Sequence, residues 1–404
     1  MRRDDAFDVV IVGAGLVGVS FALMLIKKEP NLSILVLESN KLISTGKTAV
    51  TDSDPRGIAL SKDSKNIFYT SGLWAALEKS AEPIESIHVS DKGHLGITRL
   101  NRSPDDKDPL GYVVEGGLLS ESLRKEVSRT EIQIRYSTEI TDALIEKDQV
   151  KLFTNKSNTV ITAKLFVVAN GAYSKIASKL GFCMKSRDLG QKAIVASVTL
   201  DRQHRGIAYE RFTPSGVIAM LPLSASLSQS KATLIWTQPL ESALRLERAT
   251  NVSFLDELQA QFGYRNGIFT DISARASFAL TTSFAEEMIR ARLVLLGNAA
   301  HNLHPVAGQG LNLSLRDAVR LADAVARAFN ANTDFGSVSV LDQYRKDRLL
   351  EQQLIAAFTE NLPALFSSQK LIIKLGRNIG LLSLDLLPFL REKFLYFGTN
   401  GRAF

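Results

Sequence analysis

A glycine-rich turn close to the N-terminus constrains the fold more than any other stretch of this chain. Residues 8–38 read as an apolar strand, a turn with the spacing G-x-G-x-x-G, a helix and a second strand. Gly13 permits the tight turn, Gly15 lets a pyrophosphate approach the backbone, and Gly18 lets the helix pack closely on the strand. Glu38 ends the second strand, where a carboxylate accepts hydrogen bonds from ribose hydroxyls. The pattern predicts a βαβ unit that binds a dinucleotide rather than an ordinary glycine turn, and it does not separate FAD from NAD.

A second ligand-binding pattern lies near residue 300. Residues 297–317 read GNAAHNLHPVAGQGLNLSLRD and follow an apolar strand at 293–296. Gly308 and Gly310 carry no β carbon, so the backbone there can approach a flat ligand. The amphipathic pattern from Leu311 predicts a helix whose N-terminus presents free N–H groups and a positive dipole end. Such a device suits a planar ring that becomes anionic on reduction, and together with the first motif it indicates a flavin.

The remaining reactive side chains give no sign of a metal centre. His301 and His304 lie three residues apart, but no cysteine or acidic cluster nearby completes a metal site. We therefore expect packed or backbone-bonded histidines. The single cysteine, Cys183, excludes an intramolecular disulfide, and its neighbours Phe182 and Met184 are more typical of a small buried residue than of a catalytic thiol.

Charge and hydropathy limit the partners. The formal net charge of +7 fits an anionic membrane surface or anionic ligands, while nucleic acid is not expected because no nucleic-acid motif or long basic block is present. The most apolar stretch, residues 375–390, is interrupted by charges and a proline and does not predict a spanning helix. Residues 354–395 mix apolar and basic side chains, which fits a surface for a membrane or a partner protein, or a helix packed on the nucleotide-binding domain. We expect a cytoplasmic protein, at most peripheral on the cytoplasmic face of the inner membrane.

The order of the patterns predicts a mixed α/β (α+β) fold. Separated segments build a Rossmann-like FAD-binding domain, a β-sheet substrate domain is inserted between them, and the C-terminus is helical. Strand patterns dominate residues 192–237, and the pattern near residue 300 then returns to ligand chemistry. We expect the FAD-binding domain at 1–74, 110–178 and 286–339, the substrate domain at 75–109 and 179–285, and the helical segment at 340–404.

Three further motifs allow both a functional and an ordinary interpretation. Arg56, in the segment DPRGIALS, either reaches a phosphate or the flavin edge or is a solvated surface arginine. A buried strand ends in Asn170-Gly171, which by itself predicts an ordinary turn. Residues 209–222 predict a hairpin whose Arg211 either faces a substrate or, more simply, is a paired surface arginine.

Taken together and in this order, the motifs resemble those of the flavin-dependent aromatic hydroxylases of the para-hydroxybenzoate hydroxylase fold. Within that group they are most similar to ubiquinone-biosynthesis hydroxylases of the 2-octaprenyl-6-methoxyphenol hydroxylase type. The matching segments span nearly the whole chain: RGIALS at 56–61, IHVSDKGHLG at 87–96, YERFT at 209–213, AMLP at 219–222, the stretch 297–316, and RNIGL at 377–381.

The resemblance implies a place for each candidate residue. It puts the first glycine motif at the FAD pyrophosphate, Glu38 at the adenosine ribose and Arg56 on the cofactor. It puts the late loop along the pyrophosphate, the ribitol and the isoalloxazine through Asn298, Gly308, Gln309, Gly310, Leu311 and Asn312. Pro305 and Arg211 are candidates for the substrate pocket, and no general base stands out.

Three positions depart from the family pattern. Asn298 stands where the family usually has aspartate, and its amide can still hydrogen-bond a ribitol hydroxyl. Asn170 replaces the aspartate of an Asp-Gly motif that the family links to FAD and NAD(P)H binding. Ser122 stands near the place of an expected arginine. We therefore expect FAD affinity to rest more heavily on the other contacts.

The resemblance implies an FAD-dependent monooxygenase that uses NAD(P)H and dioxygen to hydroxylate the aromatic ring of a polyprenylated phenol in ubiquinone biosynthesis, with no metal. The C-terminal segment is the expected contact with a membrane surface or with other proteins of that pathway. The alternatives are a flavin hydroxylase of another ring position or of a small soluble phenol, a flavin-linked reductase or oxidase, and a flavin-binding accessory subunit of a biosynthetic complex.

Overall fold

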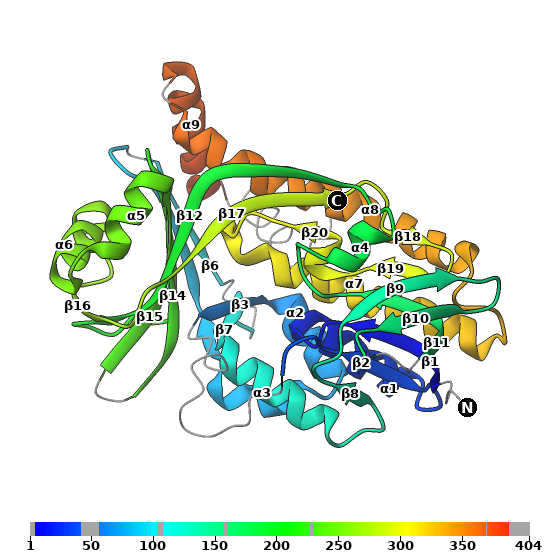
Figure 1. Ribbon diagram of the computed structural model, residues 1–404. Helices are drawn as coiled ribbons and strands as arrows, with labels where there is room; N and C mark the ends of the chain where they lie inside the picture. The colour runs from blue at the N-terminus through cyan, green and yellow to red at the C-terminus, as the bar shows by residue number, and fades with distance from the viewer. Residues whose placement is uncertain are drawn as a thin grey trace.

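The computed structural model describes residues 5–41, 56–94, 96–102, 108–156, 160–226, 229–368 and 370–387. Two large sheets stand apart and are joined by long strands and by a layer of helices (Figure 1). The content of 39% helix and 35% strand confirms the predicted mixed α/β class. The domain boundaries stay a prediction.

The dinucleotide half is built on a sheet with a parallel centre. Its strand order is β18-β19-β11-β1-β2-β8, in which β19, β11, β1, β2 and β8 run parallel, and β10 and β9 extend it from β11. Valines and isoleucines fill the central strands because helices or other strands cover both faces. The strands are β1 Asp5–Val12, β2 Ile34–Leu37, β8 Gln133–Arg135, β9 Ile140–Ile145, β10 Val150–Thr154, β11 Val160–Val168, β18 Ile289–Arg290 and β19 Leu293–Leu295.

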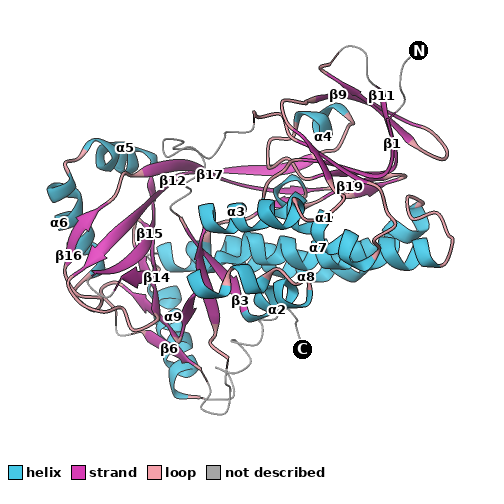
Figure 2. Ribbon diagram, turned by 90° about the horizontal axis from the view of Figure 1, so that it is seen from below, coloured by secondary structure: helices cyan, strands magenta, loops and turns pink. Residues whose placement is uncertain are grey.

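Helices cover this sheet and come from distant parts of the chain. The first, α1 (Leu16–Lys28), packs against α3 (Gly116–Val127) and α7 (Gln309–Asn330), and α7 packs against α8 (Val338–Ser367). Figure 2 shows these helices gathered in one layer beside the sheet. The late segment thereby returns to the N-terminal βαβ unit, as the order of motifs predicts.

The second large sheet forms the other half of the molecule. Its strand order is β20-β17-β12-β15-β14-β13-β5-β6, and β16 pairs with β12. Helices α5 (Leu240–Arg248) and α6 (Asn251–Phe262) cover one face and bury an apolar cluster that includes Trp236 and Phe254. The strands are β5 Ser86–Asp91, β6 Ile97–Asn101, β12 Met184–Leu200, β13 Ile207–Thr213, β14 Gly216–Ser226, β15 Gln229–Pro239, β16 Phe269–Ile272, β17 Ala276–Ala285 and β20 His301–Asn302.

A small sheet and the C-terminal helices connect the two halves. The small sheet has the order β3-β7-β4, with β3 Gly57–Ser61, β7 Gly111–Glu115 and β4 Glu82–Ile84. The last helix, α9 (Leu371–Leu386), packs against β6 at the edge of the second sheet and projects from the body of the molecule (Figure 1). No helix among the described residues is long and apolar enough to cross a membrane.

Local expectations differ from the structure at three places. The sequence pattern at 61–79 predicts one continuous helix, but α2 (Lys62–Thr70) ends before Gly72, whose φ is +70°, and two 3₁₀ turns follow. Helix α5 was not expected. Cys183 is exposed rather than buried, because it lies in the turn between α4 (Lys175–Lys179) and β12, where Phe182 turns inward instead.

Candidate cofactor and substrate site

The first glycine motif combines two tight contacts with one open position. Gly13 has φ +106°, and a β carbon on it would lie 2.5 Å from the carbonyl oxygen of Ala169. A β carbon on Gly18 would lie 2.1 Å from the carbonyl oxygen of Gly13, so the strand and the helix touch there. Gly15 lines a large cavity, and a β carbon on it would meet no atom within 4 Å. The turn is therefore closely packed against protein backbone on one side and open to the cavity on the other, as a backbone phosphate site requires.

Glu38 lies beside this turn at the end of β2. Its Oε2 accepts a hydrogen bond from the Ala14 amide at 2.9 Å, and its Oε1 accepts one from the Asn40 amide at 2.9 Å. The two bonds fix the carboxylate at the edge of the cavity. A carboxylate held in this way can accept further hydrogen bonds from ribose hydroxyls, because each oxygen has two lone pairs.

The late loop forms the opposite wall of the same cavity. Asn298 lies in a 3₁₀ turn, Gly297–Ala299, directly after β19. Gly308 adopts φ +59° and precedes the first turn of α7, which begins at Gln309, two residues earlier than expected. Gly310 lines the cavity, and a β carbon there would meet nothing within 4 Å.

Asn312 fastens this loop to the small sheet. Its Oδ1 accepts hydrogen bonds from the Ser61 amide at 2.9 Å and the Ser64 hydroxyl at 2.6 Å, and its Nδ2 donates to the carbonyl oxygens of Ala59 and Gly308 at 3.0 and 2.7 Å. All of its amide groups are thus engaged within the protein. Its side chain positions the loop, a role that the sequence pattern did not reveal.

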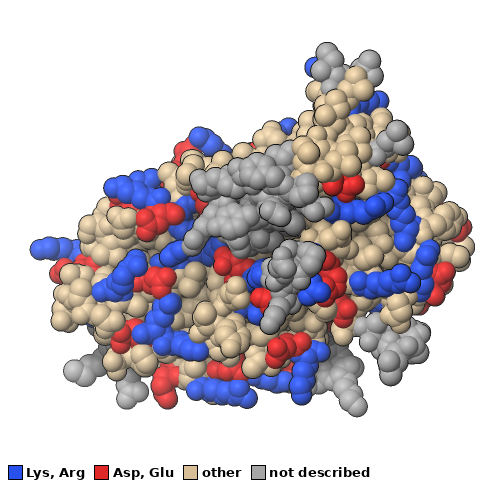
Figure 3. Space-filling model, turned by 180° about the vertical axis from the view of Figure 1, so that it is seen from behind, with Lys and Arg blue, Asp and Glu red and all other residues tan. Residues whose placement is uncertain are grey.

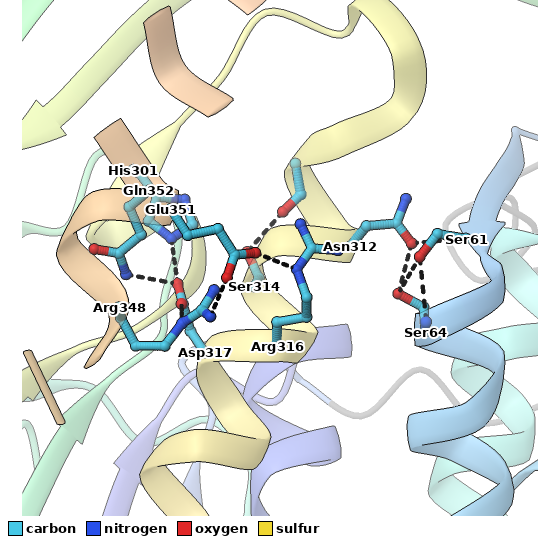
Figure 4. A network of polar contacts seen from close by, with 11 residues as sticks. Ser61, Ser64, His301, Asn312, Ser314, Arg316, Asp317, Arg348, Glu351 and Gln352 are labelled. Carbon is cyan, nitrogen blue, oxygen red and sulfur yellow. Dashed lines mark hydrogen bonds and ion pairs between the residues drawn. The ribbon is translucent and has the colours of Figure 1, made fainter. Parts of the chain in front are cut away.

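A buried polar network lies behind the loop (Figure 4). Asp317 on α7 is 1% exposed, accepts a hydrogen bond from Arg348 at 2.6 Å and one from Gln352 at 2.9 Å, and lies 2.6 Å from His301 Nε2. Glu351 accepts hydrogen bonds from both Arg348 and Arg316. Burial alone would raise the pKa of Asp317, but Arg348 and His301 outweigh it and hold that pKa at about 2. The network ties α7, α8 and the loop strand β20 together.

The structure brings ten of the predicted cofactor residues to the cavity and leaves one behind it. The exception, Gly18, packs against Gly13. Arg56 lines the cavity with its guanidinium 5.1 Å from the centre of the Phe278 ring. The residues at the cavity wall are Gly13, Gly15, Glu38, Arg56, Asn298, Gly308, Gln309, Gly310, Leu311 and Asn312.

The structure places only one of the two candidate substrate-pocket residues at the cavity. Pro305 lines the cavity between the late loop and the second sheet. Arg211 does not line it: its Nε donates to the carbonyl oxygen of Gln261 on α6 at 3.0 Å, and one terminal nitrogen lies 3.3 Å from Ser90 Oγ. Side chains alternate along a strand, so Arg211 shares the α6 face with Tyr209 while Phe212 turns toward the cavity.

The cavity continues far beyond the loop. Its volume is about 1750 Å³, and it runs from Gly13 and Glu38 past Pro305 into an apolar space between the second sheet and the helices α8 and α9. Phe212 stacks on Phe366 there, with ring centroids 3.8 Å apart. Residues of this end had no recognisable motif, because they are single side chains from separate elements: Val195, Phe212, Leu221, Ile235, Phe358, Leu362, Phe366, Leu381 and Leu384.

The histidines agree with the expectation of packed or backbone-bonded rings. His304 Nδ1 accepts a hydrogen bond from the Val306 amide at 3.2 Å, and His301 lies in the buried network. Across the described residues no group of His, Cys, Asp and Glu side chains is arranged to hold a metal ion.

The residues at the wall fit FAD. The open faces of Gly15 and Gly310 form a cradle that β carbons would fill, and Gly171 at the end of β11 is open in the same way. The N-termini of α1 and α7 both reach this cradle and favour negative charge there. Glu38 supplies a carboxylate at one end of the cradle, and the backbone at 308–310 offers a flat approach at the other.

Comparisons with known proteins agree with this site. A family model described as FAD binding domain matches residues 6–359. The chain is similar to the ubiquinone hydroxylase UbiL of Rhodospirillum rubrum, 30% identical over 97% of this chain and 89% of that protein. It is also similar to the 3-demethoxyubiquinol 3-hydroxylase of Escherichia coli, 27% identical over 97% of this chain and 98% of that protein.

A solved structure supports the fold. The p-nitrophenol 4-monooxygenase PnpA of Pseudomonas putida superposes with a TM-score of 0.78 at 18% identity, covering 99% of this chain and 100% of that chain. FAD is accordingly the cofactor, with NAD(P)H as the co-substrate typical of this family. The chain therefore belongs to the FAD-binding-domain family and is an FAD-dependent aromatic-ring monooxygenase of its hydroxylase group.

Proposed function

We propose that this monooxygenase uses NAD(P)H and dioxygen to hydroxylate the aromatic ring of a polyprenylated phenol in ubiquinone biosynthesis. The similarity to the ubiquinone hydroxylase of Rhodospirillum rubrum and to the 3-demethoxyubiquinol 3-hydroxylase of Escherichia coli supports this choice of pathway. The cavity continues beyond Pro305 into an apolar space, and this observation supports a prenylated substrate. A small soluble phenol needs no such space, whereas an isoprenoid tail gains free energy in proportion to the apolar area it buries.

The proposed roles of the wall residues follow from their positions. Gly13 and Gly15 hold the pyrophosphate of FAD through backbone N–H groups, with Gly18 keeping the helix close, and Glu38 holds the adenosine ribose. Arg56 and Asn298 contact the cofactor from opposite walls. The stretch 308–312 lies along the isoalloxazine, where the N-terminus of α7 stabilises negative charge on the ring.

When bound, FAD would supply the redox chemistry, in which NAD(P)H delivers two electrons, one oxygen atom of dioxygen enters the phenol ring and the other leaves as water. The protein chain holds the reactants in position and excludes water from the site. Pro305 and the stacked pair Phe212–Phe366 bound the space in which the ring is held. Because most side chains around this end of the cavity are apolar, they exclude water from the reacting atoms.

The projecting helix α9 suggests how so insoluble a substrate arrives. Leu375, Ile379, Leu382 and Leu386 recur at helical spacing and are 55%, 63%, 39% and 73% exposed. A flanking face is held to β6 and to the residue before it: Asn378 accepts from the Gly96 amide, and Asp385 accepts from the Arg99 amide. We propose that this exposed stripe, called here the α9 stripe, rests on a lipid bilayer.

Two features favour a bilayer as the occupant of the α9 stripe. Gly376 and Gly380 lie beside the stripe and line the cavity, so the substrate space reaches the surface next to it. Figure 3 shows Lys and Arg side chains gathered near the base of the projecting helix, which suits anionic headgroups. The chain would then be a peripheral protein that draws the phenol from the membrane.

The proposed function is tested with purified protein, FAD, NADPH, dioxygen labelled with oxygen-18 and two matched phenols, one with a polyprenyl tail and one without. We expect labelled product from the tailed phenol and a much higher KM for the tail-less one. Equal turnover of both phenols would favour the small-phenol alternative. Flavin reduction without labelled product would favour a reductase or oxidase, and failure to bind FAD would favour an accessory subunit.

A further inference from the structure

His304 is a buried histidine, and only one of its two ring nitrogens has a hydrogen-bond partner among the described residues. The residue is 3% exposed and lies directly before Pro305 at the wall of the cavity. The Val306 amide donates to its Nδ1 at 3.2 Å, so Nδ1 is the acceptor and Nε2 carries the proton. Nε2 has no hydrogen-bond partner among the described residues.

The free N–H of His304 faces the cavity. His301 Nδ1 is sealed off by protein atoms, whereas His304 Nε2 is not, and the His304 ring belongs to the cavity wall. The ring is also locked in place, because Val306 packs in the apolar cluster with Phe212 and Phe366. An N–H donor in an apolar space costs free energy until an oxygen accepts its hydrogen bond.

The charge state of His304 decides what it can do. Burial lowers its pKa to about 4, so the ring is neutral at physiological pH, and no charged neighbour contributes to that shift. The charged side chains that line the cavity are Glu38, Arg56, Glu139, Lys175, Glu210 and Arg377. With Nδ1 engaged by the backbone, the ring has no free lone pair with which to take a proton. His304 is a donor at this wall and not a general base.

We propose that His304 donates its Nε2–H to the ring oxygen of the bound phenol and favours the phenolate form. This inference rests on the proposed function. A phenolate oxygen accepts a stronger hydrogen bond than a neutral hydroxyl, so a fixed donor lowers the pKa of the bound phenol. The phenolate is the more electron-rich ring, and the donor also fixes which ring carbon faces the cofactor.

Two variants distinguish a role of His304 as a hydrogen-bond donor from a purely structural role. His304→Asn keeps an acceptor near the place of Nδ1 for the Val306 amide but has no donor at the place of Nε2. His304→Gln keeps a donor near Nε2. Holoprotein of each, with FAD content and thermal unfolding measured as folding controls, is titrated with pH in the presence of an alkyl-tailed 4-nitrophenol whose phenolate absorbs in the visible.

We expect the wild-type protein to lower the pKa of the bound nitrophenol below its value in water. His304→Asn should raise that pKa by about one to two, a tenfold to hundredfold change in phenolate fraction, as expected for a hydrogen bond to a charged group. His304→Gln should recover most of the effect. An unchanged pKa in His304→Asn overturns the inference, as does a wild-type protein that leaves the pKa of the bound nitrophenol unshifted.

A third outcome identifies another partner for the same nitrogen. If His304→Asn shifts the flavin absorbance and leaves the phenol pKa unchanged, His304 contacts the cofactor and the inference is wrong. Failure of the proposed function itself is visible separately, because the wild-type protein would then give no labelled product from the prenylated phenol. Loss of labelled product in the variants alone leaves the function standing.

Discussion

The two ends of the cavity are built in different ways. At the dinucleotide end the backbone makes the site, through glycine turns and the first turns of α1 and α7. At the other end single side chains from β12, β13, β14, β15, α8 and α9 make the wall. Gly13 and Gly18 tolerate almost no change, because an added β carbon meets backbone atoms that cannot rotate away, whereas a β carbon on Gly15 or Gly310 would occupy open space at the cavity wall. A side-chain site can lose one contact and keep its shape.

The strongest test of this contrast adds side chains to glycines. Gly18→Val should abolish the folded protein, because its β carbon would lie 2.1 Å from the Gly13 carbonyl oxygen, and the cost should exceed the usual few kcal/mol, about 1–3, of overpacking. Gly15→Ala should fold normally and lose FAD, since its β carbon points into the cavity. Circular dichroism and FAD fluorescence measure the two properties.

The matched control for these glycines is Gly376→Ala in the other half. Gly376 also lines the cavity, and a β carbon on it meets nothing within 4 Å. This variant should keep both the fold and FAD. Loss of FAD in Gly376→Ala, or tight FAD binding by Gly15→Ala, would contradict the contrast between the two ends.

The next largest effect concerns the network behind the late loop. Asp317→Asn removes one of the two carboxylates that pair with the buried Arg348 and leaves Glu351, so the cost should stay below the about 3–5 kcal/mol of a fully broken buried ion pair. Urea unfolding should show this loss at neutral pH. Arg327→Ala is the control, because Arg327 is exposed on the same helix and is not among the hydrogen-bond partners within the network. A loss below about 1 kcal/mol would show that the network does not hold the loop.

Asp317 also predicts a dependence on pH. Its pKa is held at about 2 in the folded protein, against 3.8 for the unperturbed group. A lowered folded-state pKa stabilises the fold above the unfolded-state value, and that stability is lost as pH falls from about 4 toward 2. Wild-type protein should therefore lose free energy of unfolding more steeply over this range than Asp317→Asn, in parallel urea titrations.

The same contrast explains what the sequence revealed. The fold class, the flavin site and most of its residues follow from motifs, because a backbone site needs glycines at fixed spacing along one short stretch. The fastening of the late loop by Asn312 was not predicted, since its partners lie on a distant strand, whereas the backbone bond of His304 was expected. The placement of Arg211 was left open, because strand alternation shows its direction only when the position of α6 is known. Phe212 and Phe366 meet only after α8 folds back on β13.

The bilayer proposal gives a smaller effect, confined to the substrate half. Ile379→Gln together with Leu386→Gln makes the α9 stripe polar and should lower binding to anionic phospholipid vesicles about tenfold, since each buried apolar side chain contributes only part of its ~1.5–3 kcal/mol at an interface. Val252→Gln, an equally exposed position on α6, should leave binding unchanged. Flotation of the full chain with vesicles measures both.

Two other results would assign the α9 stripe differently. Wild-type protein that does not float with vesicles but forms a dimer, which the double variant abolishes, would make the stripe an interface between two copies. Wild-type protein that stays monomeric and unbound would contradict the bilayer proposal outright. In either case turnover of a detergent-solubilised phenol should be the same in the wild type and the double variant.

The smallest expected effect is at Asn298, where the family resemblance leads one to expect aspartate. Asn298→Asp keeps an oxygen that accepts from a ribitol hydroxyl but replaces an amide donor by a negative charge close to the proposed pyrophosphate site. The lost donor and the added repulsion oppose the gain from a stronger acceptor, so the opposing effects partly cancel. FAD affinity, measured by fluorescence titration, should therefore change less than tenfold, about 1.4 kcal/mol. A change above a hundredfold would show that a side chain governs FAD affinity at the dinucleotide end. That result would contradict the contrast between a backbone site at this end and a side-chain site at the other.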